Sequence, residues 1–277
     1  MTKKKNIKTE KEGVNITVVL PVHQLNGESE TTLLNNAIAS VVNQEAKADE
    51  LIIVVPEGSD VEKTMKNFDF GAAKDIVRVV SNPNGSDFQT QINYGISEVK
   101  TEWFSFLEFD DEYSTKWFQN VVTYREAHND IEVFMPIIVD VNSEDGGFMG
   151  LTNEAVWANS FSDELGVLDN NALLAFQNFN IDGFVMKKST FDAWGGFKKN
   201  IKLTFIYEYL LRITVNGARV MVIPRFGYKH QNQRPGSLFA NYGNEMNPVE
   251  ANWWLEQAKK EYFHSRERDI TYEENIS

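Results

Sequence analysis

The sequence contains no cysteine, which excludes a disulfide framework, thiolate catalysis and any cysteine-bound zinc site. It also lacks an apolar run of the roughly 20 residues that a membrane-spanning helix needs. Residues 1–13 are polar and rich in lysine, without the apolar segment of a signal peptide. We therefore expect a soluble, cytoplasmic protein with a flexible N-terminal tail.

Positive charge is scarce. There are 27 lysines and arginines against 40 acidic residues, which gives a formal net charge of −13. Proteins that bind a nucleic-acid backbone need clustered basic residues, so we expect no direct nucleic-acid binding. A nucleotide ligand remains compatible, because a bound divalent cation can supply positive charge locally. The 277 residues, 42% of them hydrophobic, suit one large domain with a core of its own.

The first half of the chain alternates between two hydrophobic patterns. Five continuous apolar runs predict strands that are buried on both faces of a sheet. Segments with helical spacing lie between them, around residues 33–42, 88–99 and 117–124. This alternation predicts a mainly parallel sheet with helices on both sides. The five runs are Ile16–Val22, Leu51–Val55, Ile76–Val80, Trp103–Phe109 and Val133–Val139.

The second half is less regular, and residues 141–180 carry no pattern that can be assigned. The spacing predicts a helix over 204–216 and a strand over 219–224, with the proline as its last residue. A further helix is predicted from Asn247 to about His264, since Asn, Pro and Glu stand in the order of a helix start.

The fourth apolar run ends in four acids within five residues, namely Glu108, Asp110, Asp111 and Glu112. In open α/β sheets, ligands bind beyond the carboxyl ends of the strands. Carboxylates gathered there repel one another unless a cation offsets their charge, and oxygen ligands favour Mg²⁺ or Mn²⁺. Such an ion stabilises a diphosphate leaving group. The alternative is an acidic turn exposed to solvent.

The order and spacing of motifs over residues 15–115 resemble the family 2 glycosyltransferases. The motifs are a first strand at Val18–Val22, a helix containing Ala37–Val41, a second strand at Glu50–Val55, Asn82–Gly85, Asn93–Ile96 and the acidic strand end in the family's Asp-x-Asp position. Later segments extend the resemblance to about residue 235, through Asp182–Ser189, Tyr207–Arg212 and Tyr228–His230.

The resemblance implies the GT-A fold, an α/β domain with a mostly parallel sheet flanked by helices and a C-terminal helical extension. The expected divisions are a tail over 1–13, the GT-A domain over 14–235, and a C-terminal helix and polar tail over 236–277. It also implies an inverting transfer, in which a carboxylate takes a proton from an acceptor hydroxyl and the nucleotide diphosphate leaves with help from a metal.

Transferred residue by residue, the resemblance implies roles for particular side chains. It implies that the metal, Mn²⁺ or Mg²⁺, is bound by Asp110, Asp111 and His230. It implies that the donor nucleotide is bound by Pro21, Val22, Glu57, Asn93, Glu108 and Asp110. His230 has an alternative as an ordinary loop residue. His23 either faces the nucleotide or solvent, and solvent is favoured.

The chain departs from the family pattern at two places. Pro56-Glu57-Gly58-Ser59 stands where the family has Asp-Asp-Gly-Ser, and Phe205-Ile206 stands where it has the Glu-Asp pair that supplies the catalytic base. Glu208 lies two positions on, a rotation of about 200° along a helix. It is either a replacement base or an i+4 partner of Arg212, which is favoured. Asp182 is a second candidate base, and Asp192 a third.

Two functions remain open at this point. The first is a transferase that uses a nucleotide-diphospho-sugar and a hydroxyl acceptor, whether glycan, protein or lipid-linked. The second is a catalytically degenerate GT-A fold that serves as a binding or structural subunit, with a protein partner on the C-terminal helix. A nucleotidyltransferase ranks low, because residues 23–28 contain one glycine and no lysine or arginine for a phosphate loop.

Overall fold

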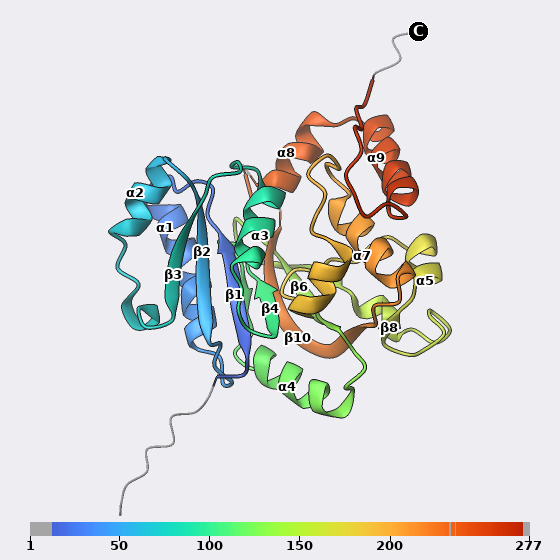
Figure 1. Cartoon of the computed structure of the whole chain (residues 1–277), viewed down its shortest axis with the longest axis horizontal. Coiled ribbons are helices and arrows are strands. Elements are labelled where there is room, and N and C mark those ends of the chain that lie inside the picture. Colours follow the sequence, from blue (N-terminus) through green and yellow to red (C-terminus); the bar gives the residue numbers. More distant parts are fainter. Residues whose placement is uncertain (1–12, 233, 236, 274–277) are drawn as a thin grey trace, which may run out of the picture.

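The computed structural model describes residues 13–273 except 233 and 236, and its centre is a single mixed sheet (Figure 1). The strands run in the order β3-β2-β1-β4-β9-β6-β10-β5, with β7 added to β6 and β8 to β10. The first half supplies a parallel unit, in which β1 pairs with both β2 and β4, and β2 pairs with β3. Its strands are β1 (Ile16–Pro21), β2 (Glu50–Pro56), β3 (Val77–Asn82) and β4 (Trp103–Phe106).

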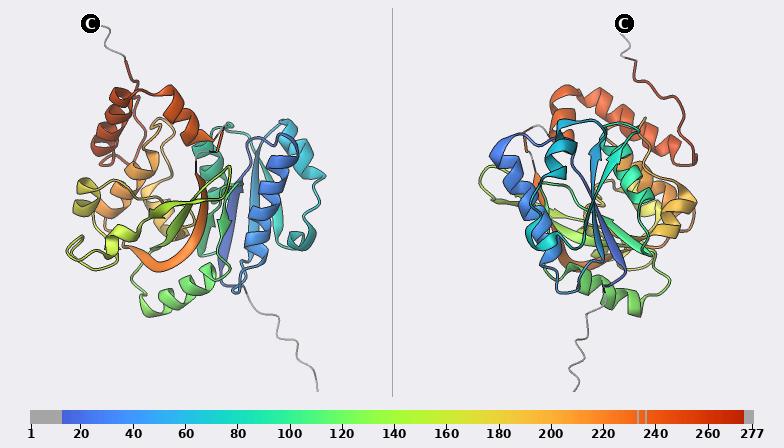
Figure 2. Two further views of the ribbon diagram at one scale, coloured as in Figure 1. Left: turned by 180° about the vertical axis from the view of Figure 1, so that it is seen from behind. Right: turned by 60° about the vertical axis from the view of Figure 1, so that its left-hand side comes forward.

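Helices cover both faces of this parallel unit. Helix α1 (Gly27–Val42) lies on one face and α3 (Phe88–Ser97) on the other (Figures 1 and 2). Successive strand residues point to opposite faces, so Val18 packs in one hydrophobic cluster and Val19 in the other. The continuous apolar runs are explained by this burial on both sides, and the predicted α/β architecture is confirmed.

The second half extends the sheet with strands of both directions. β6 (Val133–Asn142) and β10 (Val220–Asn232) are parallel neighbours, and β9 (Val185–Lys187) is antiparallel to both β4 and β6. β5 (Glu112–Tyr113) is antiparallel to β10. The segment that resisted assignment contains β7 (Phe148–Thr152), a 3-10 turn (Glu154–Trp157), β8 (Val167–Leu168) and α5 (Asn170–Ala175).

The remaining helices lie around the sheet. They are α2 (Asp60–Lys66), α4 (Trp117–Ala127), α6 (Lys188–Trp194), α7 (Phe205–Val215), α8 (Leu238–Glu245) and α9 (Pro248–Glu261), with a 3-10 turn at Gly71–Ala73. Helix α9 packs against α7, so the C-terminal extension lies on the second half of the domain (Figure 1). Among the described helices, none is long and apolar enough to cross a membrane.

Several predicted boundaries differ from those in the structure. The strand expected over 219–224 does not end at Pro224 but runs to Asn232, because shifts in the register with β6 around Phe226 accommodate the missing N–H. The fourth strand ends at Phe106, three residues early, since Leu107 to Phe109 turn towards the acids. Helix α9 ends at Glu261, close to the predicted end at about His264, and Asn247 caps it as predicted. The tail predicted over 1–13 lies outside the described residues except for Gly13.

Candidate functional site

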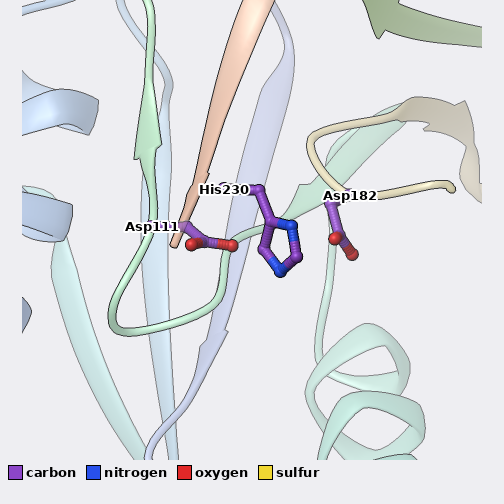
Figure 3. Close-up of side chains that lie close together, drawn as sticks. All are labelled: Asp111, Asp182 and His230. Atoms are coloured by element: carbon purple, nitrogen blue, oxygen red, sulfur yellow. The ribbon is translucent and has the colours of Figure 1, made fainter. Parts of the chain in front are cut away.

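Three titratable side chains from separate segments meet at the carboxyl end of the sheet. Asp111 follows β4, Asp182 precedes β9, and His230 lies near the end of β10. One ligand atom from each lies within 4.8 Å of the others. The ring of His230 stands between the two carboxylates (Figure 3). Asp111 and Asp182 are 1% and 2% exposed. The sequence predicts Asp111 and His230 as metal ligands and Asp182 as a base, and the structure gathers all three into one cluster.

Each carboxylate of this cluster is held through one oxygen and leaves the other unused. The backbone N–H of Gln231 donates to Asp111 Oδ1 at 2.7 Å, and the Asn180 amide donates to Asp182 Oδ2 at 2.5 Å. Asp111 Oδ2 and Asp182 Oδ1 are buried without a hydrogen-bond partner among the described residues. Buried polar atoms of this kind are rare and indicate an unseen water or ion.

The backbone fixes where Asp182 lies. Gly183 has φ +71°, and a Cβ there would meet the Tyr228 ring at 2.4 Å, so a side chain is excluded at this position. The Trp117 indole donates to the Gly183 carbonyl at 2.7 Å. The Tyr228 hydroxyl accepts from the backbone N–H of Glu108 at 3.2 Å. The loops that carry Asp182 and the acids after β4 are therefore held against the same tyrosine.

The electrostatics of the cluster show a deficit of positive charge. Burial, with repulsion from the neighbouring acids, raises the pKa of Glu108 and Asp111 well above the usual range, and burial raises the pKa of Asp182 to about 6. Burial alone lowers the pKa of His230, but the charge of Asp111 and the hydrogen bond that the ring donates to Asp140 raise it well above its ordinary value. A divalent cation would relieve this repulsion, and two carboxylates with one imidazole suit Mn²⁺ better than the oxygen-seeking Mg²⁺.

Asp110 lies beside this cluster and faces a different partner. Its carboxylate forms an ion pair with the guanidinium of Arg234, which also lies over the Phe109 ring with 4.9 Å to the centroid. Arg234 is 3.8 Å from Glu30 as well. The resemblance implies that Asp110 is a metal ligand, whereas in this structure its charge is offset by an arginine. The sequence analysis did not identify Arg234. Its position two residues after the end of β10, the strand that carries His230, was the one indication that it lies near the site.

A cavity of about 290 Å³ opens next to Arg234. One side is formed by the end of β1 and the start of α3, and the other by the start of α8. The lining includes Pro21 and Glu108, both predicted to bind the nucleotide. His23 also lines the cavity, whereas the sequence favours solvent for it, and burial lowers its pKa. The other lining residues include Ser86, Asp87, Phe88, Phe109, Leu238 and Asn241.

Four residues predicted for the nucleotide are not in the lining of this cavity, and Asp110, the partner of Arg234, is one of them. Val22 is fully buried in the core and Glu57 is exposed after β2. The Asn93 side chain donates to the Phe197 carbonyl at 2.7 Å and accepts from the Phe197 N–H at 2.9 Å. Asn93 therefore braces the turn before α7 with both atoms of its amide.

Glu208, a predicted base, is fully buried in a cluster of ion pairs. Lys198 Nζ lies 2.8 Å and Arg212 Nε 2.9 Å from its Oε1, and Arg212 Nη2 donates to Oε2 at 3.1 Å. The i+4 partnership with Arg212 that the helix geometry favours is confirmed. Both carboxylate oxygens are engaged, so neither is free for an acceptor hydroxyl. Asp192, the third candidate, is exposed and paired with Lys188.

The chain is similar to known proteins both in sequence and in fold. The family model "Glycosyl transferase family 2" matches residues 17–191. Comparison with curated proteins gives no match. Among solved structures, Staphylococcus aureus TarS 1–349 in complex with UDP-GlcNAc has a TM-score of 0.61 at 13% identity, over 92% of this chain and 68% of that chain. The complex of TarS 1–349 with UDP has a TM-score of 0.54 at 14% identity, over 90% and 71%.

The match to TarS is partial in length. The chain spans 60% of another TarS 1–349 structure and 43% of a longer TarS chain, with TM-scores of 0.54 at 14% and 13% identity. At such identities the likeness shows the fold, a mixed α/β domain similar to the GT-A fold of TarS.

Proposed function

The chain belongs to glycosyl transferase family 2, and from this premise we propose that it transfers a sugar from a nucleotide-diphosphate donor to a hydroxyl acceptor. One observation carries the proposal. The cavity beside Arg234 and the cluster of Asp111, Asp182 and His230 lie at the same carboxyl edge of the sheet, joined by the loop after β4. TarS, a fold relative, is described in complex with UDP-GlcNAc and with UDP, which supports a UDP-sugar as the first donor to test.

The donor nucleotide would occupy the cavity between β1, α3 and α8. Pro21 and Phe88 offer apolar walls to the base, and Glu108 offers a carboxylate to the ribose. Arg234 stands at the side of the cavity that faces the acids. Its planar guanidinium suits a diphosphate, because it can donate two parallel hydrogen bonds to phosphate oxygens.

Asp111, Asp182 and His230 fit a divalent cation, since they offer two unpaired carboxylate oxygens and one imidazole nitrogen. A cation bound there would offset the negative charge of the departing diphosphate. The chain contributes by holding these ligands in place before the donor arrives, through the bonds of Gln231 to Asp111 and Asn180 to Asp182. Asp110 then serves to aim Arg234, with no role as a ligand.

Two roles compete for Asp182. As a cation ligand it would use Oδ1, and as the base of an inverting transfer it would use the same atom to accept the proton of the acceptor hydroxyl. Its closeness to ligand atoms of Asp111 and His230 favours the first role. Asp182→Asn distinguishes them, because loss of Mn²⁺ binding supports a ligand, while loss of turnover with Mn²⁺ binding retained supports a base. Glu208 is not proposed as the base, because its oxygens are engaged by buried cations.

One observation favours the alternative of a degenerate subunit. Phe205 and Ile206, which replace the family's Glu-Asp pair, are both buried in the hydrophobic core. A protein of this kind would bind a nucleotide weakly or not at all and would not turn over a sugar donor. A protein partner on α9 belongs to the same alternative.

Calorimetric titration of UDP, with and without Mn²⁺, tests the proposal, followed by hydrolysis and transfer assays with UDP-, GDP- and dTDP-sugars. We expect Mn²⁺ to strengthen UDP binding and Asp111→Ala to remove that gain. Asp60→Ala provides a matched control, since it removes an exposed carboxylate from α2. Binding without turnover of any donor would support the degenerate subunit. Absence of both binding and turnover across the whole panel would contradict the transferase and leave the structural subunit.

A further inference from the structure

Asp140 makes a contact with His230 that none of the roles above explains. The two residues are direct partners in the register of the parallel strands β6 and β10. Parallel neighbours in register project their side chains to the same face of the sheet. The carboxylate Oδ1 of Asp140 lies 2.8 Å from His230 Nδ1. The contact follows from strand pairing, so it is built into the sheet.

The second oxygen of Asp140 is also engaged. The Thr152 hydroxyl, from the neighbouring strand β7, donates to Asp140 Oδ2 at 2.7 Å. The side chain of Asp140 is 13% exposed and that of His230 24% exposed. Two strands thus hold the carboxylate on opposite sides, and its orientation towards the ring is fixed.

This arrangement determines which nitrogen of His230 is available. An ionised carboxylate only accepts hydrogen bonds, so the ring nitrogen that faces Asp140 must carry the proton. The neutral imidazole then has its lone pair on Nε2, since only one nitrogen is protonated. In metal sites, a histidine ligand commonly donates its other N–H to a carboxylate in this way.

We propose that Asp140 is the positioning residue of the cation site: it holds His230 with the proton on Nδ1, so that Nε2 is presented to the ion beside Asp111 and Asp182. The proposal rests on the proposed function for its cation. Thr152 has a supporting part, since it orients the carboxylate that orients the ring.

The first experiment measures the tautomer and needs no metal. Histidine-selective ¹⁵N labelling gives signals from only four histidines, and His230→Ala identifies the signal of interest. In the metal-free protein, at a pH where this imidazole is neutral, we expect the proton on Nδ1. In Asp140→Ala we expect the signal to move towards the other tautomer. A proton on Nε2 in the wild-type protein would overturn the proposal.

The second experiment measures Mn²⁺ affinity by calorimetry. We expect Asp140→Ala to weaken binding roughly 10- to 100-fold, the usual effect of removing such a partner. Asp140→Asn should lose less, because its amide oxygen can still accept from Nδ1. Thr152→Val should lose less than Asp140→Ala. If only the negative charge of Asp140 mattered, the Asn and Ala variants would be equally weak, and the positioning role would be excluded.

Controls separate this proposal from the function on which it rests. His230→Ala should abolish tight Mn²⁺ binding, and Asp60→Ala should leave it unchanged. If His230→Ala binds Mn²⁺ like the wild type, the cation site itself is wrong. If His230→Ala loses binding while Asp140→Ala retains it, the cation site stands and Asp140 has no positioning role. Melting curves of each variant without metal show whether a loss reflects unfolding.

Discussion

The guanidinium of Arg234 is paired with the carboxylate of Asp110, at the boundary between the candidate donor cavity and the acidic cluster. The side chain of Arg234 is 11% exposed and that of Asp110 is 6% exposed. The stacking of Arg234 on Phe109 limits the directions that the guanidinium can take. A guanidinium therefore lies at the edge of the cavity where the diphosphate of the proposed donor would bind. Arg234 and a divalent ion at the neighbouring cluster would share the charge of a bound diphosphate.

Arg234→Ala is expected to weaken UDP binding roughly 10- to 100-fold, because hydrogen bonds to charged groups contribute about 1.5–3 kcal/mol. The UDP affinity of Arg234→Lys should lie between those of the wild type and Arg234→Ala, because a lysine keeps the charge but loses the planar guanidinium and its stacking on Phe109. Calorimetry with UDP measures both. Tighter UDP binding by Arg234→Ala would mean that the arginine competes with the ligand's cation for Asp110, which is the opposite of the role proposed here.

The sequence predicts most of the parallel unit because its signal is local. Val18, Val19 and Leu20 are all fully buried, and a strand buried on both faces must be apolar at every position. The position of the acids after β4 could be predicted for the same reason, because they mark the end of the fourth apolar run. Pro224 shows where local prediction fails. The proline alone predicts the end of a strand, but shifts in the register with β6 allow β10 to continue past it.

The candidate site is less predictable, because its contacts join segments far apart in the chain. His230 and Asp140 are 90 positions apart and Arg234 and Asp110 are 124 apart. Nothing in the local pattern of residues 133–142 reveals the register of β6 that places Asp140 across from His230. The pairing of Glu208 with Arg212 could be predicted because it is an i+4 contact on one helix, whereas Lys198, its other partner, could not.

Glu208→Gln is expected to destabilise the fold while leaving donor turnover nearly unchanged. It leaves Lys198 and Arg212 buried without their counter-ion, and breaking a buried pair costs about 3–5 kcal/mol. Lys198 also donates to the Glu261 carbonyl at the end of α9, so the C-terminal helix should loosen as well. Urea denaturation measures the stability. Donor turnover, measured where the variant remains folded, should stay within a few-fold of the wild type; a loss of several orders of magnitude would restore Glu208 as the base.

Stability of the metal-free protein should fall as the pH rises from about 4 to 6. Burial raises the pKa of Asp182 to about 6, so in this range the folded protein keeps a proton that the unfolded chain has released. The stabilisation is present below the unfolded pKa and is lost as the pH rises through the folded one, with a size on the order of 3 kcal/mol at most. The raised pKa of His230 adds a loss in the same direction above its ordinary value of 6.5.

Urea denaturation in EDTA across this pH range, on the wild type and Asp182→Asn, isolates the contribution of Asp182. The asparagine does not titrate, so the wild type should lose stability relative to the variant between pH 4 and 6. Mn²⁺ should reduce the loss by offsetting the ionised carboxylates. A difference between the two proteins that does not change with pH would contradict the burial of Asp182.

Gly95 tests how closely α3 packs on the sheet. A methyl group at this position would lie 2.4 Å from Val19 Cγ1 and 2.6 Å from Val54 Cγ2. Alanine normally favours a helix interior over glycine by about 1 kcal/mol, but overpacking a core costs about 1–3 kcal/mol. We expect the steric term to win, so that Gly95→Ala lowers the free energy of unfolding.

A double-mutant cycle with Val54→Ala separates the two terms. Shortening Val54 makes room on one side, so Gly95→Ala should cost less in the Val54→Ala background than in the wild type. Ser97→Ala, at an exposed position of the same helix, provides the control for helix propensity and should change stability by only a few tenths of a kcal/mol. If Gly95→Ala stabilises the protein as much as propensity alone predicts, then α3 does not approach β1 and β2 as closely as these contacts require.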